Sequence, residues 1–185
     1  EFLRVKQHLG RVLLVFPSHS LDKEGFKSQY NIKEFTDEID RVARDFDTVL
    51  ISLHYDDVSR AVEYEKRGFI CVSSGHTNDP FFMHRQRSII ELSDVTMSNA
   101  VGTHVGYCIY LKKPHYLFKQ KIGGGKDNVV EKLTKRWCDD SIYEKEVSEV
   151  ESAFDYYSSS ITEYQFEIAN KYWGFEYIKT PEKLK

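Results

Sequence analysis

The chain has 185 residues, of which 41% are hydrophobic and 30% are charged, and its formal net charge is −3. This length is enough to bury the core of one domain, and the composition is that of an ordinary globular protein. The small negative charge argues against nucleic acid or another polyanion as a partner.

The three cysteines are widely spaced, without a CxxC pair or the spacing of a zinc site, so we expect reduced thiols. No apolar run approaches the roughly 20 residues that span a bilayer, and the N-terminus lacks the features of a signal peptide. We therefore expect a cytoplasmic protein with no transmembrane segment, at most peripheral to the inner face of the membrane. The chain opens on Glu1 in a polar, helix-like stretch, from which we expect an N-terminal part to be missing.

Five apolar runs in chain order are predicted as strands, and polar or glycine-containing turns and helical spacing follow the first four. The first run is apolar without interruption, which is typical of a strand buried on both faces. The segment after it has apolar residues at steps of three and four, which predicts an amphipathic helix. The predicted strands are 11–16, 48–53, 69–73, 94–97 and 114–118. The predicted helices between them are 32–46, 59–67, 80–92 and 105–111, the third with Asp79 as its N-cap.

This alternation predicts an α/β fold with a Rossmann-like, doubly wound parallel sheet and helices on both faces. We expect residues 11–118 to form this core. Residues 119–185 are predicted to add a polar loop and C-terminal helices that pack on the same domain. These helices are expected at about 129–137, 143–156 and 161–173, the last ending at Gly174.

Histidines gather where such a sheet would place a site, because ligands bind beyond the carboxyl ends of the strands, where the strand order reverses. Four of the seven histidines follow predicted strands, namely His19, His54, His76 and His104. We expect at least two of them to belong to a site. A zinc site built from these four is an alternative, but no His-x-His or His-x₃-His pair supports it, and we expect no bound metal.

The turn 98–104 joins a predicted strand to a predicted helix, and its residue types suit a phosphate. The first N–H groups of a helix have no intrahelical partner, and the helix dipole is positive there. Gly102 would allow the backbone to approach an anion, while Ser98 and Thr103 would donate hydroxyl hydrogen bonds. Simple capping of the helix by Ser98, Asn99 or Thr103 accounts for the same residues, and both interpretations stay open.

The segment 98–114, SNAVGTHVGYCIYLKKP, resembles the donor-phosphate segment in the C-terminal domain of GT-B-type glycosyltransferases of bacterial capsule or lipopolysaccharide synthesis. The resemblance covers about residues 11–118 and, more loosely, 165–184. It implies that the core binds a nucleotide sugar as substrate, with no cofactor and no protein-held metal, and that the acceptor is a glycan or a lipid-linked group. The catalytic base in this family usually comes from an N-terminal domain, so we expect a missing domain or partner subunit to complete the site.

The resemblance also implies a role for each loop. The loop after the third strand would lie near the nucleobase, the turn 98–104 would hold the donor phosphates, and the loop after the first strand would face the transferred sugar. His19 or His104 would donate a proton to the leaving phosphate. Where better-known members have an acidic ribose-binding residue, His104 and Tyr107 stand instead. The candidate donor-binding residues are Ser18, Ser20, His54, Gly75, His76, Thr77, Ser98, Asn99, Gly102, Thr103 and Tyr107.

Other features have simpler interpretations. Arg85 and Arg87 would face the phosphates or, more simply, form surface ion pairs within their helix. The pair Asp56–Asp57 is expected to cap the helix from Ser59 rather than to bind a cation. The run 123–125 is a glycine turn and does not match a phosphate-binding Walker loop.

Two further classes of function remain alternatives. A nucleotide-sugar epimerase or a hydrolase would use the same fold and a related phosphate turn. A non-catalytic interaction module would use the polar region 119–160 as its partner surface.

Overall fold

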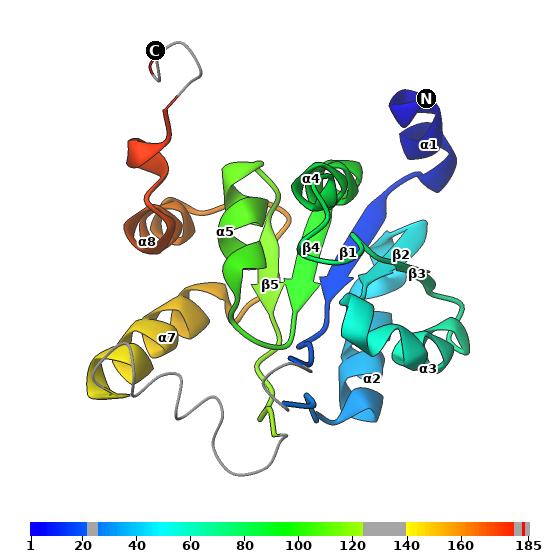
Figure 1. Cartoon of the computed structure of the whole chain (residues 1–185), viewed down its shortest axis with the longest axis horizontal. Helices are drawn as coiled ribbons and strands as arrows, with labels where there is room; N and C mark the ends of the chain where they lie inside the picture. The colour runs from blue at the N-terminus through cyan, green and yellow to red at the C-terminus, as the bar shows by residue number, and fades with distance from the viewer. Residues whose placement is uncertain (22–25, 124–139, 180–182, 184–185) are drawn as a thin grey trace.

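The structure is a computed structural model that describes residues 1–21, 26–123, 140–179 and 183. Five parallel strands form one sheet in the order β3-β2-β1-β4-β5, with helices on both faces (Figure 1). The strands are β1 (Val12–Phe16), β2 (Thr48–Ser52), β3 (Ile70–Val72), β4 (Val95–Ser98) and β5 (His115–Leu117). The predicted Rossmann-like α/β fold and all five predicted strands are confirmed.

Strand β1 is central, and all five of its residues are buried. It pairs on one side with β2, where Val12 aligns with Thr48, and on the other side with β4, where Leu13 aligns with Val95. The chain order reverses between β1 and β4, which makes this junction the switch point of the sheet. The outer strands β3 and β5 have only three residues each.

Alternate side chains of β1 point into two different cores, as expected for a strand covered on both faces. Leu13 and Val15 pack with residues of α2 (Ile32–Val42) and α3 (Ala61–Glu65). Leu14 and Phe16 pack with residues of α4 (Phe82–Leu92) and α5 (Thr103–Tyr110). Phe16, the last residue of β1, therefore lies on the face that carries α5.

Three helices differ from the prediction at their ends. The predicted helix 59–67 is preceded by a 3₁₀ helix, η3 (Tyr55–Arg60), and becomes α-helical only in α3. The helix predicted from Pro80 begins at Phe82, and Asp79 is not its N-cap. The carboxylate of Asp79 instead accepts a hydrogen bond from the Phe81 N–H at 2.8 Å, which closes a turn ahead of the helix. The helix predicted over 32–46 ends as the short 3₁₀ helix η2 (Ala43–Asp45).

The C-terminal helices α7 (Asp140–Phe154) and α8 (Glu163–Trp173) pack with α5 and β5 in a third core. Helix α8 starts with a capping box between Thr162 and Gln165 and ends at Gly174 in the left-handed conformation, as predicted. The short 3₁₀ helix η4 (Phe175–Tyr177) follows. The helix predicted at 129–137 lies outside the described residues.

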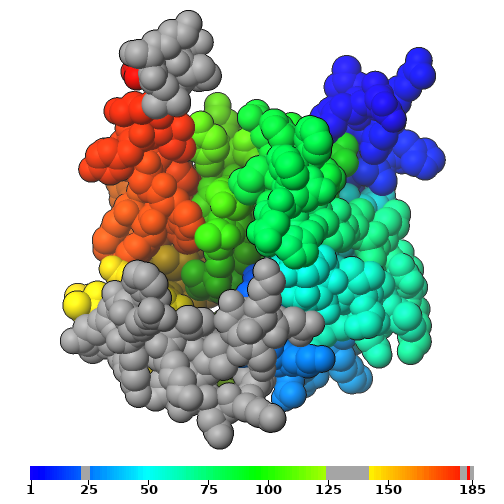
Figure 2. All heavy atoms as spheres, viewed as in Figure 1, coloured from blue at the N-terminus to red at the C-terminus, as the bar shows by residue number. Residues whose placement is uncertain are grey.

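The N-terminal helix α1 (Phe2–Leu9) has no buried residue and projects from one corner of the molecule (Figure 2). Its Lys6 forms an ion pair with Asp94, which precedes β4. None of the helices in the described part of the chain has the length and apolar character needed to cross a membrane. Cys71 and Cys108 are free thiols, as expected, and Cys138 lies outside the described residues.

Candidate functional site

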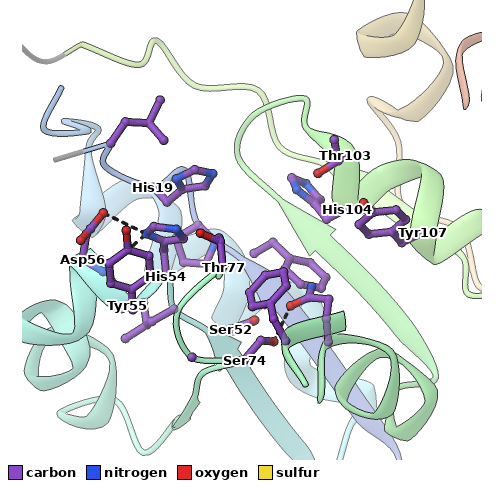
Figure 3. A pocket seen from close by; sticks show the side chains of 17 residues that line it. His19, Ser52, His54, Tyr55, Asp56, Ser74, Thr77, Thr103, His104 and Tyr107 are labelled. Atoms are coloured by element: carbon purple, nitrogen blue, oxygen red, sulfur yellow. Dashed lines mark hydrogen bonds and ion pairs between the residues drawn. The ribbon is translucent and has the colours of Figure 1, made fainter. Parts of the chain in front are cut away.

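A cleft of about 340 Å³ opens at the carboxyl ends of β1, β2 and β3 and at the N-terminus of α5 (Figure 3). This is the edge of the sheet at which open parallel folds bind their ligands. Seven of the predicted site residues line it, namely His19, His54, Gly75, Thr77, Thr103, His104 and Tyr107. The six that do not line it are Ser18, Ser20, His76, Ser98, Asn99 and Gly102.

The cleft has two walls that come from different parts of the chain (Figure 3). His19, His54 and Thr77 belong to the wall formed by the loops after β1, β2 and β3. The opposite wall consists of side chains of α5, among them Thr103, His104 and Tyr107. A ligand in the cleft would therefore contact loops on one side and a helix N-terminus on the other.

Four aromatic side chains form a row across the ends of three strands. The rings of His19 and His54 stack with centroids 4.5 Å apart and 19° between their planes. The ring centroid of Tyr55 lies 4.3 Å from that of His54 and 4.3 Å from that of His76. Three of the four histidines predicted at the strand ends are thus brought together. His76 is the end member of the row and does not line the cleft.

His54 is held in its neutral form within this row. Burial is the largest cause that lowers the pKa of His54, and the neighbouring His19 lowers this pKa further. Asp56, whose carboxylate lies 3.4 Å from Nδ1 of His54, acts in the opposite direction but does not reverse the shift. The row therefore presents an uncharged imidazole to the cleft at its centre.

His104, on the other wall, is also neutral. Its ring stacks on Phe16 with centroids 4.9 Å apart and an angle of 18°. Burial lowers the pKa of His104 to about 3. Its Nε2 atom is buried and has no hydrogen-bond partner among the described residues. This atom is unusual, because buried polar atoms are nearly always hydrogen-bonded.

Gly102 makes room for this histidine. A Cβ atom at position 102 would lie 2.8 Å from Cε1 and 2.9 Å from Nδ1 of His104, which is too close for a real contact. The backbone of Gly102 is extended, with φ −164°, so its conformation does not require glycine. We predicted that Gly102 would admit a phosphate to the backbone, and in the structure the absence of a side chain at this position also leaves room for the imidazole.

Ser98 and Asn99 are fully buried beneath the turn and hold it in place. The Ser98 hydroxyl donates to the carbonyl of Ala100 at 3.0 Å. Asn99 accepts from the Ser18 N–H at 2.6 Å and so links the loops after β4 and β1. Both residues stabilise the switch point and do not face the cleft.

Helix α5 begins after Gly102 without a hydrogen bond from any capping side chain. The interpretation of Ser98, Asn99 or Thr103 as its cap is therefore wrong. Within the described residues, the backbone N–H groups of Thr103 and His104 have no hydrogen-bond partner. The N-terminus of α5 thus keeps donors available for an anion.

The loop after β1 is fastened by Asp57, which is 5% exposed. Its carboxylate accepts from the backbone N–H of Ser20 at 2.6 Å and from the Ser20 hydroxyl at 2.7 Å. The prediction that Asp57 caps the helix from Ser59 is wrong, because η3 begins earlier, with His54 at its N-cap position. Ser20 is in turn buried, and its polar atoms are used inside the loop.

Arg85 supports the loop after β3. Its Nε donates to the carbonyl of Ser74 at 2.7 Å, and its guanidinium pairs with Asp79 at 3.0 Å. Gly75 has φ +81°, and a Cβ there would lie 2.9 Å from Nη2 of Arg85, so this position favours glycine twice over. Arg87 pairs with Glu91 at 2.8 Å. Neither arginine lines the cleft, which agrees with the simpler of the two interpretations.

Sequence reasoning missed Gln86, which lines the cleft from α4 and is 8% exposed. Its Oε1 accepts from the buried Ser74 hydroxyl at 2.5 Å. The signal was present, because Gln86 is a polar residue four positions before the buried Ile90, on the side of the helix that faces the sheet. In the described ranges, no three side chains of His, Cys, Asp or Glu are placed to hold one metal ion.

No protein-family model matches the chain, and no curated protein or solved structure matches it. The fold and the cleft define the class of protein. It is a Rossmann-like α/β domain with an imidazole-lined cleft at the carboxyl edge of its sheet.

Proposed function

We propose that this chain is the donor-binding domain of a GT-B-type glycosyltransferase of bacterial surface polysaccharide synthesis, and that the cleft binds a nucleotide sugar. The observation that carries the proposal is the uncapped N-terminus of α5 at one wall of the cleft, opposite a row of imidazoles. Free N–H groups at a helix N-terminus are suited to the phosphates of a nucleotide. The resemblance of the segment 98–114 to donor-phosphate segments of this family supports the same assignment.

The side chains at this wall suit the same ligand. Thr103 is exposed at the start of α5, and its hydroxyl has no hydrogen-bond partner within the described residues. The volume of the cleft lies near the lower end of the range for small-molecule sites. If a second domain or partner subunit completes the donor site, the part of the cleft that this chain forms alone is expected to have a small volume.

Of the two histidines expected to protonate the leaving phosphate, we retain His19. A general acid must carry a proton near the working pH. Burial lowers the pKa of His104 to about 3, so that residue stays neutral. His19 is exposed and lines the cleft opposite α5. The nucleotide sugar is the substrate in this proposal, no cofactor takes part, and the acceptor is a glycan or a lipid-linked group.

A thermal-shift panel of UDP, GDP, CMP, CDP and dTDP tests the proposal. A ligand that binds only the folded state stabilises that state by mass action, by about 2.7 kcal/mol at a ligand concentration of a hundred times its Kd, and so raises the melting temperature. We expect at least one of these nucleotides to do so. A panel in which none shifts the melting temperature would contradict the proposal.

The substitution Thr103→Ala then locates the site. The loss of one hydroxyl hydrogen bond to a phosphate should weaken binding by about 1 kcal/mol, and by up to about 3 kcal/mol if the phosphate is well desolvated. Ser88→Ala is the matched control, because Ser88 is an exposed hydroxyl residue on α4 that does not line the cleft. Equal nucleotide affinity in wild type and Thr103→Ala would place the ligand elsewhere.

A further inference from the structure

The imidazole of His104 is fixed in one tautomer. Its interaction with the backbone of Ala100 favours the protonated ring, so the ring nitrogen is the donor and the carbonyl oxygen the acceptor in this contact. Because Nε2 has no hydrogen-bond partner in the described part of the chain, we assign the donating atom as Nδ1. In a neutral ring the remaining nitrogen, Nε2, then carries a lone pair and acts only as an acceptor.

A buried polar chain holds the carbonyl that selects this tautomer. The Ser98 hydroxyl donates to the same Ala100 oxygen at 3.0 Å and lies 3.0 Å from Nε2 of His115. Nδ1 of His115 lies 2.8 Å from the Thr96 hydroxyl, and His115 is 1% exposed. Burial lowers the pKa of His115 well below its usual value, so this ring is neutral too. The direction of the lone pair on His104 is therefore set from within the sheet.

We infer that Nε2 of His104 accepts a hydrogen bond from an uncharged donor group of the bound ligand, namely a hydroxyl of the sugar or the ribose. The inference rests on the proposed function, and it makes His104 a residue that determines specificity. A buried acceptor without a partner is costly, and a ligand hydroxyl at this wall of the cleft would remove that cost.

The same geometry separates the two ends of the ligand. A phosphate oxygen carries no hydrogen at neutral pH and would repel the lone pair of Nε2, so the phosphates belong at the free N–H groups and at Thr103. An uncharged, hydroxyl-bearing part of the ligand belongs against His104. Binding of the anionic end and of the hydroxyl-bearing end should then respond to different substitutions.

Calorimetry and thermal shifts with His104→Phe test the inference. Phenylalanine keeps a ring on Phe16 but has no acceptor atom. We expect the best-binding nucleotide of the panel to lose about 5- to 150-fold in affinity, the range for one unmet hydrogen bond. The stabilisation by sulfate, an anion without a hydrogen to donate, should be equal in wild type and variant. His104→Gln, whose Oε1 replaces the acceptor, should recover part of the affinity. His8→Phe, on α1 and away from the cleft, is the control for the substitution itself.

Nitrogen-15 NMR of the imidazoles gives a second readout that needs no variant. We expect Nε2 of His104 to be unprotonated from pH 5 to pH 8 and to shift when the nucleotide binds. A protonated Nε2 at pH 7, or equal affinity of wild type and His104→Phe for both the nucleotide and the corresponding nucleotide sugar, overturns the inference. If no nucleotide binds wild type, the proposed function fails, and the protonation state of Nε2 still decides whether His104 is an acceptor.

Discussion

The imidazole rings of His19 and His54 stack 4.5 Å apart, although they belong to loops that follow different strands. The stack joins the ends of β1 and β2 into one wall of the cleft. Two positive charges at this separation would repel each other, and His19 is one of the groups that lower the pKa of His54. The wall is therefore compatible with at most one charged imidazole at its centre.

Acidification should destabilise the fold. Burial lowers the pKa of His54, His104 and His115 below 6.5, so the unfolded chain binds more protons than the folded one below that pH. Stability then rises with pH in this window and falls as the pH drops from 7.5 to 5.5. His104 alone should contribute about 1 kcal/mol of this loss.

Urea unfolding of wild type, His104→Phe and His8→Phe at both pH values measures this contribution. The difference in unfolding free energy between pH 7.5 and pH 5.5 should be smaller in His104→Phe by about 1 kcal/mol. The control His8→Phe should behave as wild type. An unchanged pH dependence in His104→Phe would show that this residue titrates normally.

Asp57→Asn should loosen the loop after β1. In wild type, the N–H and the hydroxyl of Ser20 both donate to the Asp57 carboxylate. The amide of asparagine has only one oxygen, which is neutral, and its NH₂ group would face a second donor. Arg60 would also lose its ion pair with the carboxylate, which lies 3.4 Å away. We expect a loss of about 2 kcal/mol in unfolding free energy. Asp40→Asn, which breaks an exposed ion pair with Arg67, should cost much less, because solvent screens exposed charges. Similar losses in both variants would argue against a special role for Asp57.

Gly102→Ala should act through His104. The added methyl group would force the imidazole away from its place, because it would lie 2.8 Å from Cε1. We expect nucleotide affinity to fall by about 1 kcal/mol while the fold survives, since the backbone there is extended. In a His104→Ala background the same substitution should have no effect. A double-mutant cycle measured by calorimetry detects the coupling, and additive effects would refute it.

Gly106→Ala should disrupt the contact between α5 and α8. A Cβ at position 106 would lie 2.2 Å from Cγ of Trp173, so the indole or the helix must move. Alanine has the higher helix propensity by about 1 kcal/mol, but overpacking typically costs about 1–3 kcal/mol, so we expect net destabilisation. In a Trp173→Ala background the same change should be neutral or stabilising. Thermal unfolding of the four proteins in this cycle decides, and destabilisation in both backgrounds would contradict the packing argument.

The five strands were predictable because each is a short apolar run. Strand β1 is buried on both faces, and accordingly all of its residues are apolar. The first residues of the helices were less predictable from the sequence. The residues Asp79 and Pro80 are typical of a helix N-terminus, but the carboxylate closes a turn instead, and the sequence pattern does not distinguish the two. Local residue types indicate where a helix begins only to within a few positions.

The candidate site was predictable in its location but not in the direction of its side chains. The loops that end β1, β2 and β3 had to meet at one edge of the sheet, and the histidines on them do so. Whether Ser98 and Asn99 face the cleft or the interior depends on their register with β5 and on contacts with Ser18 and Gln120. Asp57 was misassigned for the same reason, because its partner Ser20 lies in another loop.

The outer strands of the sheet are short. An edge strand exposes unpaired backbone groups on which a strand of another molecule can align, and long edges promote aggregation. With three residues each, β3 and β5 offer a poor template, and β5 is also screened by α7, where Phe154 lies 6.0 Å from His115. Lateral growth of the sheet from one molecule to the next through these two strands is therefore disfavoured.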